Sequence, residues 1–290
     1  MESAINLLRL MRPRQWVKNC FVFMGILFGN AWHDPYMVKR VLMTALAFSL
    51  GASGVYIVND LLDRKEDANH SHRKHRPLAA QTVTSSMAVS LMVVLWIVGF
   101  VSGYLVSVQV LLILSAYVLI NFGYSLGLKH IVLVDVFLLA SGFMLRIFAG
   151  TTGVGIAPSP WLLLCGFMLA LFLGFAKRRA ELYASTEGST GNRRVLTSYQ
   201  PLFLDKLIVI TSTCVILTYS LYTMSEKTIK VHRTESLIYT VPFVIYAIFR
   251  YIYSLHNQSM GSDPALEIFR DYHILAAIAG WLLLTLWLIA

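Results

Sequence analysis

Long apolar stretches separated by polar segments constrain the fold of this chain more than any other feature. A helix needs about 20 mostly apolar residues to cross the hydrocarbon core of a bilayer, and about nine stretches come near that length. They cover residues 19–33, 41–58, 87–105, 108–124, 131–150, 160–176, 206–225, 236–255 and 274–290. The pattern predicts an all-α, polytopic membrane protein in which residues 1–290 form a single transmembrane domain.

The composition supports this prediction. Apolar residues make up 57% of the sequence and charged residues only 13%, which is about half the charged share of an ordinary soluble domain. A soluble globule of this length would need a far more charged surface. The composition therefore excludes a soluble enzyme, a disordered protein and a disulfide scaffold.

The charge distribution predicts how the spans are oriented. The net charge is +9, and most Lys and Arg residues fall in the N-terminal segment and in two long polar loops, residues 59–86 and 177–205. Because cytoplasmic loops carry the excess of Lys and Arg, we expect the N-terminus and both loops to face the cytoplasm, in an inner-membrane protein surrounded by the lipid bilayer. Residues 1–18 mix bases with apolar side chains and are expected to form an amphipathic helix at the interface. Nucleic acid is not expected as a partner, because no long basic run or base-stacking module is present.

Four oxygen-bearing side chains follow directly after the second predicted span. Asn59, Asp63 and Asp67 are spaced four residues apart, so a helix that continued through them would place them on one face, with Asp60 at its border. Carboxylates clustered in this way repel each other unless a cation is present, and hard oxygen ligands suit Mg²⁺. The spacing therefore favours a Mg²⁺ site at this end of the span. The alternative is a solvated helix end that carries ordinary surface acids.

A set of short motifs resembles the UbiA prenyltransferase superfamily over nearly the whole chain. The motifs are Arg12-Pro13-x-x-Trp16-x-Lys18-Asn19, Asn59-Asp60-x-x-Asp63-x-x-x-Asp67, Arg76-Pro77-Leu78, and Tyr124 with Lys129 after the fourth span. As a combination they are specific, although each alone is weak. The resemblance implies a helical bundle around a central cavity, capped on the cytoplasmic side, where Mg²⁺ holds a diphosphate.

One segment departs from the usual pattern of that family. Where most members carry a second aspartate-rich motif after the sixth span, this chain reads Lys177-Arg178-Arg179-Ala180-Glu181. Bases are better suited than aspartates to bind an anion directly, although positive-inside anchoring would also explain some of them. The substitution resembles the bacterial decaprenyl-phosphate phosphoribosyltransferases. That resemblance implies transfer of 5-phosphoribose from phosphoribosyl diphosphate to a polyprenyl phosphate, with release of diphosphate, in the supply of precursors for cell-wall arabinan.

The motifs and the charged residues inside the spans single out the candidate site. Asp60, Asp63 and Asp67 are the expected catalytic residues, and together with Asn59 they are the expected ligands of Mg²⁺, the cofactor. The side chains expected to bind substrate are Lys18, Asn59, Arg76, Tyr124, Lys129, Asp135, Lys177, Arg178 and Glu181. The sequence leaves open which base binds which phosphate, the role of Arg146, and the oligomeric state, a homo-oligomer included.

Two other functions compete with phosphoribosyl transfer. One is a prenyltransferase that moves an isoprenoid from its diphosphate to an aromatic acceptor, and a regular second aspartate motif would favour it. The other is a transporter, which predicts inverted repeats and broken spans at mid-membrane. No repeat is visible, and the polar cluster falls at one membrane face.

Overall fold

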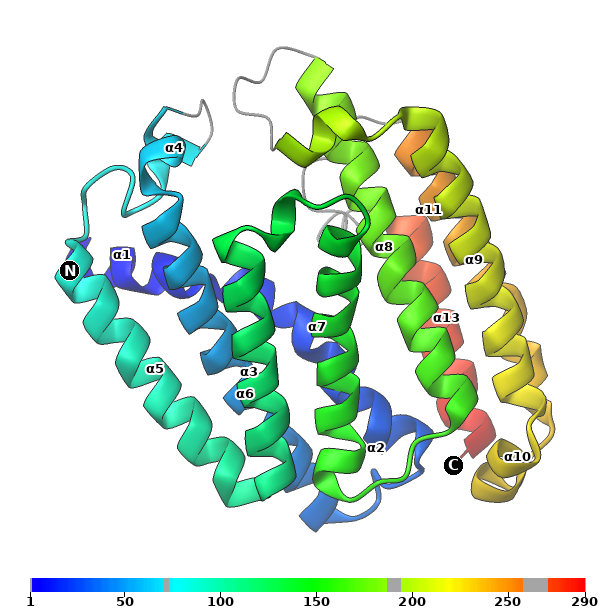
Figure 1. The fold of residues 1–290 in the computed structure, drawn as a ribbon. Helices are drawn as coiled ribbons and strands as arrows, with labels where there is room; N and C mark the ends of the chain where they lie inside the picture. Colours follow the sequence, from blue (N-terminus) through cyan, green and yellow to red (C-terminus); the bar gives the residue numbers. More distant parts are fainter. Residues whose placement is uncertain (1, 70–72, 187–193, 258–270, 290) are drawn as a thin grey trace. The chain divides into compact units, whose positions relative to one another are not determined.

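The computed structural model describes residues 2–69, 73–186, 194–257 and 271–289, and every regular element among them is a helix (Figure 1). The longer helices are α3 (Pro35–Leu62), α5 (Ser85–Val106), α6 (Val108–Leu126), α7 (Val134–Gly150), α8 (Pro160–Thr186), α9 (Pro201–Met224), α11 (Val241–Asn257) and α13 (Tyr272–Ile289). The shorter α-helices are α1 (Glu2–Met11), α2 (Met24–Phe28), α4 (Arg64–Ala68) and α10 (Glu226–His232). The 3₁₀ segments are η1 (Pro13–Phe23), η2 (Arg73–His75), η3 (Leu128–His130), η4 (Thr152–Val154), η5 (Arg194–Ser198) and η6 (Ser236–Thr240).

Eight helical segments within the described residues are long and apolar enough to cross a membrane. They are Pro35–Leu62, Ser85–Val106, Val108–Leu126, Val134–Val154, Pro160–Tyr183, Pro201–Met224, Ser236–Asn257 and Tyr272–Ile289. Each overlaps one of the stretches predicted from residue 41 onward. The prediction of an all-α, multi-pass membrane protein is therefore confirmed.

The N-terminal stretch corrects the sequence prediction in two places. The expected helix over residues 1–18 ends at Met11, because Arg12 precedes a proline, which disfavours the α conformation, and takes left-handed angles of φ 52° and ψ 58°. The expected span over residues 19–33 is not one long α-helix: it is built from the 3₁₀ segment η1 followed by the five-residue helix α2. This stretch packs tightly, since a Cβ atom added at Gly150 would lie 1.8 Å from the Val22 carbonyl oxygen.

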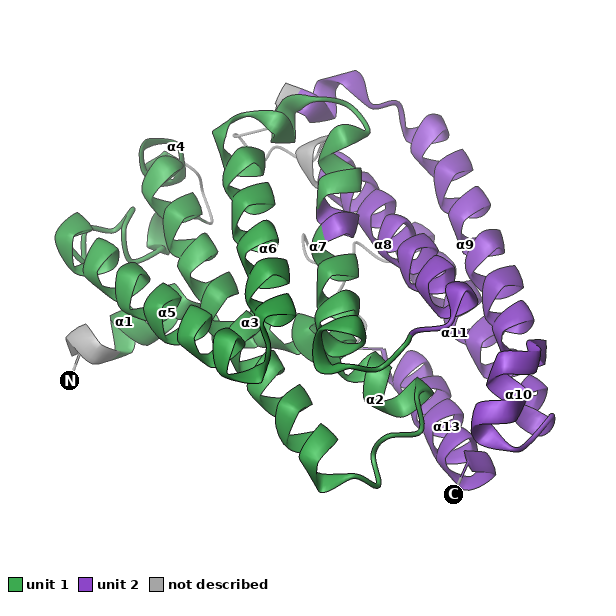
Figure 2. Cartoon of the chain, turned by 60° about the horizontal axis from the view of Figure 1, so that its bottom comes forward, with its two compact units in different colours: residues 1–138, 142–157, 189–193 green, residues 139–141, 158–188, 194–290 purple. Residues whose placement is uncertain are grey.

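The chain divides into two compact units, which Figure 2 shows in green and purple. Unit 1 comprises residues 1–138, 142–157 and 189–193, and unit 2 comprises residues 139–141, 158–188 and 194–290. That residues 1–290 form a single domain stays a prediction.

Helix α3 is the centre of unit 1, where it contacts α1, η1, α5 and α6. Phe48, Ala52 and Val55 of α3 are buried in one cluster with Leu114 and Tyr117 of α6. Small residues let the neighbouring helices approach α3 closely. A Cβ atom at Gly54, for example, would lie 2.2 Å from the indole nitrogen of Trp96 on α5.

Polar contacts tie the helices of unit 2 to one another. Arg179 on α8 forms an ion pair with Asp205 on α9 and donates a hydrogen bond of 3.0 Å to the Leu255 carbonyl of α11. Arg250 on α11 donates a hydrogen bond of 2.7 Å to Asp271, the residue that precedes α13. Arg179 and Asp271 are largely withdrawn from solvent, so these contacts satisfy polar groups that would otherwise lack a partner. They join α8 to α9 and α11, and α11 to the start of α13.

Candidate functional site

The acidic motif lies where α3 ends and the chain turns into α4. Asp63 is the C-terminal cap of α3, with φ −86° and ψ 4°, and its amide still donates a hydrogen bond of 2.9 Å to the Asn59 carbonyl. The Asp67 amide in turn donates a hydrogen bond of 2.8 Å to the Asp63 carbonyl. The i to i+4 pattern thus continues across a small bend, and Asn59, Asp63 and Asp67 follow one another as the spacing predicts.

Arginines occupy the space between two of the carboxylates. Nη1 of Arg76 lies 3.1 Å from Oδ1 of Asp60 and 2.6 Å from Oδ2 of Asp67. Arg12, from the junction between α1 and η1, pairs with the same Asp60 oxygen. The side chains of Asp60 and Asp67 are only 2% exposed, and buried charges are tolerated when they are paired in this way.

The linker between α6 and α7 supplies the partners of the other two motif residues. Nζ of Lys129, on η3, lies 2.9 Å from Oδ1 of Asp63. The hydroxyl of Ser125, near the end of α6, donates a hydrogen bond to the amide oxygen of Asn59. Tyr124, the neighbour of Ser125, is also buried. Residues more than sixty positions apart in the chain therefore meet at the end of α3.

The charges of this cluster explain how carboxylates sit together. Three acids, Asp60, Asp63 and Asp67, face the bases Arg12, Arg76 and Lys129, so protein cations supply the positive charge that the sequence argument assigned to a metal. No group of three or more His, Cys, Asp or Glu side chains arranged to hold a metal ion occurs in the described part of the chain.

One carboxylate atom nevertheless fits a cation that is not part of the protein. Oδ1 of Asp67 is buried and accepts no hydrogen bond from the described residues, and the nearest ion-pair partner is Nη1 of Arg73, 3.8 Å away. Buried polar atoms are normally satisfied. A hard oxygen left open beside a second carboxylate, Asp60, suits Mg²⁺ if Arg76 turns away.

Lys18 and Asp135, two further predicted site residues of unit 1, are buried to different extents. Lys18 is on η1 and is half-buried; its neighbour Asn19 contacts Ser49, about three helical turns before Asp60 on α3. Asp135 is fully buried in the first turn of α7. The contacts described above join Asn59, Asp60, Asp63, Asp67, Arg76 and Lys129 into one cluster; they do not include Lys18, Tyr124 or Asp135.

Arg146 has a defined environment in the middle of unit 1. Its Nε donates a hydrogen bond of 2.7 Å to Oδ1 of Asn19, and Nη2 donates one of 3.1 Å to the hydroxyl of Tyr117. The guanidinium also lies over the Tyr117 ring, 4.6 Å from its centroid. The neutral acceptors and the aromatic face let a buried cation persist at this depth.

The predicted basic segment of unit 2 lies in the last third of α8. Arg178 is fully buried and forms an ion pair with Glu181, one turn further on, while Lys177 is half-buried. Arg179, next to them, has the structural role described above. That Lys177, Arg178 and Glu181 bind substrate stays a prediction. The segments 70–72 and 187–193 of the two predicted loops lie outside the described residues.

Sequence reasoning missed several members of the cluster. Arg12 was noted as part of a motif but not as a partner of Asp60, and Ser125 was not singled out. The signal for Ser125 was weak, because a serine near a helix end is common. The signal for Arg12 was its position directly before Pro13, in the segment that leads into the first predicted span.

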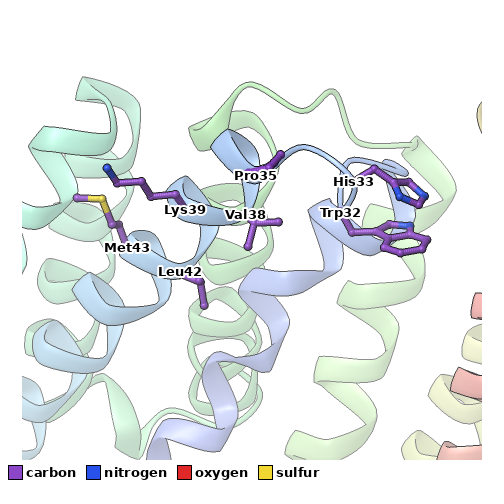
Figure 3. A pocket seen from close by; sticks show the side chains of 7 residues that line it. All are labelled: Trp32, His33, Pro35, Val38, Lys39, Leu42 and Met43. Atoms are coloured by element: carbon purple, nitrogen blue, oxygen red, sulfur yellow. The ribbon is translucent and has the colours of Figure 1, made fainter.

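A cavity of about 500 Å³ opens at the other end of α3 and is not part of this cluster. It is lined by Trp32, His33, Pro35, Val38, Lys39, Leu42 and Met43 (Figure 3). Because α3 has 28 residues, its two ends lie about 42 Å apart. The cavity holds none of the candidate site residues.

Sequence comparison shows which known proteins this chain resembles. The sequence profile of the UbiA prenyltransferase family matches residues 20–272. The chain is 33% identical to decaprenyl-phosphate phosphoribosyltransferase of Corynebacterium glutamicum over 91% of this chain and 81% of that protein. It is 29% identical to the protein of the same name from Mycobacterium tuberculosis, over 96% and 92% of the two chains.

Solved structures show the same fold. A UbiA homologue from Archaeoglobus fulgidus, solved with bound GPP and Mg²⁺, superimposes with a TM-score of 0.73 over 98% of this chain and 99% of that one, at 17% sequence identity. The family profile, the relatives and the fold agree with the motifs and with the eight membrane-spanning helices. The chain therefore belongs to the UbiA prenyltransferase family, whose members are membrane transferases.

Proposed function

We propose that this chain transfers a 5-phosphoribosyl group from phosphoribosyl diphosphate to a polyprenyl phosphate and releases diphosphate, at a site that faces the cytoplasm from the inner membrane. The observation that carries the proposal is the paired cluster at the end of α3, where one nitrogen of Arg76 contacts both Asp60 and Asp67. Such a cluster can exchange internal ion pairs for contacts with a diphosphate and its counter-ion. The names of the relatives supply the substrate class.

The residues of the cluster divide into two chemical roles. Asn59, Asp60, Asp63 and Asp67 would hold Mg²⁺, which when bound neutralises negative charge on the leaving diphosphate. Arg76, once free of the carboxylates, is placed to form charge-assisted hydrogen bonds to phosphate oxygens.

Lys129 has a similar role in the proposal. It is paired with Asp63 and reaches the cluster from the α6–α7 linker, so a phosphate that entered here would meet a lysine already held in place. Positioned cations lower the barrier most when they are aimed at charge that develops during the reaction.

The reaction itself needs little acid–base chemistry. The bond between ribose C1 and the diphosphate oxygen breaks, and its electron pair leaves with diphosphate. A bond forms between C1 and an oxygen of the acceptor phosphate. Because that phosphate is already ionised, no proton has to be removed from it, and the bases Lys177 and Arg178 have to position it rather than activate it.

The test uses the purified full-length protein in detergent with Mg²⁺, phosphoribosyl diphosphate labelled in its ribose, and decaprenyl phosphate. We expect label in the lipid phase and diphosphate in the aqueous phase, both abolished by a chelator. A parallel reaction offers an isoprenoid diphosphate and an aromatic acceptor. Product in this second reaction alone would overturn the proposal in favour of prenyl transfer.

A further inference from the structure

Residues 12–19, here called the N-terminal strap, contact one face of α3 at three points. Arg12 pairs with Asp60. The indole nitrogen of Trp16 donates a hydrogen bond of 3.0 Å to the Ser53 hydroxyl. The amide nitrogen of Asn19 donates one of 2.8 Å to the Ser49 hydroxyl, and this contact is buried.

The spacing of these contacts shows that the strap lies antiparallel along the helix. Ser49, Ser53 and Asp60 fall within about 40° of one another around α3 and span about 16 Å of its axis. Seven residues of 3₁₀ helix from Arg12 to Asn19 span about 14 Å at a rise of about 2.0 Å per residue. An α-helical strap would span only about 10 Å. The length of the 3₁₀ strap is therefore closer to the span of the three contacts than that of an α-helix would be.

The far end of the strap is held by a second helix. Oδ1 of Asn19 accepts a hydrogen bond of 2.7 Å from Nε of Arg146 on α7, while its amide nitrogen is bonded to Ser49. Asn19 is only 3% exposed and Arg146 only 4%. Because both partners of Asn19 are buried and fixed, the strap is anchored at this end and presents Arg12 at the other.

We infer that the N-terminal strap positions Arg12 as an internal counter-ion of Asp60, which competes with a divalent cation for that carboxylate. Arg12 and Arg76 both contact Oδ1 of Asp60, so that oxygen cannot serve a metal ion while both guanidinium groups stay in place. Arg12 is thus a positioning residue, and metal binding is coupled to release of the strap. This inference rests on the metal role given to Asp60 in the proposed function, but not on the identity of the substrate.

Because Arg12 competes with the metal ion, substitutions in the strap should change the affinity of the protein for divalent cations. Arg12→Gln removes the competing cation and leaves Asp60 in place, so divalent cations should bind more tightly. Asn19→Ala frees the anchored end and lowers the effective concentration of Arg12 at Asp60, so it should act in the same direction with a smaller effect. A strap with a purely structural role would lower the melting temperature and leave the metal affinity unchanged or weaker.

The experiment titrates Mn²⁺ into purified full-length protein in detergent and follows the free ion by electron paramagnetic resonance, with Mg²⁺ as competitor. For Arg12→Gln we expect an apparent Kd about tenfold lower than for the wild type, equivalent to 1.4 kcal/mol. The matched control is Arg14→Gln, which removes the same charge from an exposed position two residues away and should stay within about twofold of the wild type. Hydrogen exchange of the strap amides should also become faster when Mg²⁺ is added to the wild type.

The outcomes separate the two proposals. An apparent Kd for Arg12→Gln equal to or higher than that of Arg14→Gln overturns the strap inference while the metal site survives. If Asp60→Asn binds Mn²⁺ as the wild type does, the metal is elsewhere and both the metal role of Asp60 and the strap inference fail. If Arg12→Gln does not fold, Asn19→Ala provides the test, because Asn19 contacts α3 at Ser49, about three turns from Asp60. An unchanged affinity of Asn19→Ala for Mn²⁺ would then contradict the coupling between the strap and metal binding.

Discussion

Asp60 and Asp67 are almost completely withdrawn from solvent, and a buried carboxylate is stable only when cations or hydrogen bonds replace its water. Arg12 from the N-terminal stretch, and Arg73 and Arg76 from the segment that follows α4, supply that replacement. Removing one partner leaves a buried charge, so the acids and bases of this cluster depend on one another.

The carboxylates themselves give the first prediction. Asp60→Asn and Asp67→Asn keep the size of the side chain but remove the charge, and each should lower turnover at least about a hundredfold, as loss of a positioned electrostatic group commonly does. Initial rates at saturating Mg²⁺ check this. The control is Glu66→Gln, an exposed acid on α4 next to Asp67, which should keep near-normal rates. Normal turnover in both Asp variants would place the metal elsewhere.

The basic segment of α8 gives the second prediction. If Lys177 and Arg178 hold a substrate phosphate, Lys177→Ala and Arg178→Ala should each lose a charge-assisted hydrogen bond of about 1.5–3 kcal/mol, or roughly ten- to hundredfold in kcat/KM. Glu181→Gln should also lower kcat/KM, because Glu181 is the ion-pair partner of the buried Arg178.

The control for this series is Lys206→Ala, which removes an exposed base near the start of α9. Kinetics are measured per correctly folded molecule, because bases also guide insertion. Unchanged kcat/KM in Lys177→Ala, Arg178→Ala and Glu181→Gln would leave these residues only an anchoring role.

At the scale of the element, the long apolar helices were predictable and the strap was not. Hydrophobic length alone marks a transmembrane helix, and the eight helices follow it. The strap is 3₁₀ rather than α because of contacts with Ser49, Ser53 and Asp60, which lie thirty or more residues away in sequence. The helical spacing of Asn59, Asp63 and Asp67 was predictable for the same reason as the helices, because it is local. The partners of these residues come from other segments of the chain, and the sequence predicted only some of them.

The start of α13 gives a prediction about one helix. Oδ1 of Asp271 accepts hydrogen bonds of 2.9 Å and 3.4 Å from the amides of His273 and Ile274, and so caps the helix. Although burial opposes it, the hydrogen bonds from Arg250 and Ser254 lower the pKa of the Asp271 carboxyl. A lowered pKa means that Asp271 stabilises the fold above the pKa of the unfolded chain, about 3.9, and that this stability is lost as the pH falls below it.

Two substitutions separate the cap from the charge. Asp271→Asn can still cap the helix but has no charge to lose, so its unfolding temperature in detergent should fall less than that of the wild type between about pH 5 and pH 2. Asp271→Ala loses the cap as well, and should be less stable at pH 7 by a further 0.5–2 kcal/mol or so. The control is Glu226→Gln, whose ion pair with Lys230 is 3.6 Å long and exposed; surface pairs of this kind contribute little. An identical pH response in wild type and Asp271→Asn would contradict the assignment.

At the scale of the whole molecule, the N-terminal stretch decides the topology. The eleven residues of η1 and the five of α2 span about 30 Å together at 3₁₀ and α rises, which equals the thickness of the hydrocarbon core. Irregular backbone at membrane depth is tolerated where it is buried in protein, and Asn19, Val22 and Ile26 are buried. We therefore expect nine crossings, of which eight are long α-helices and the first is this packed stretch. Nine crossings stay a prediction from apolar length, and the conformation of the first stretch also depends on its contacts with α3 and α7.

Labelling from the two sides of the membrane tests this topology. In a variant without Cys20, Cys165 and Cys214, a single Arg9→Cys change should react with a membrane-impermeant thiol reagent only from the cytoplasmic side. A single His33→Cys change, just before α3, should react only from the opposite side, because one crossing separates the two exposed positions. Glu66→Cys, beside the acidic motif, is the reference and should follow Arg9→Cys, since Arg12 and Asp60 are in contact. Labelling of Arg9→Cys and His33→Cys from the same side would mean that the stretch turns back within the membrane, so that the chain crosses eight times.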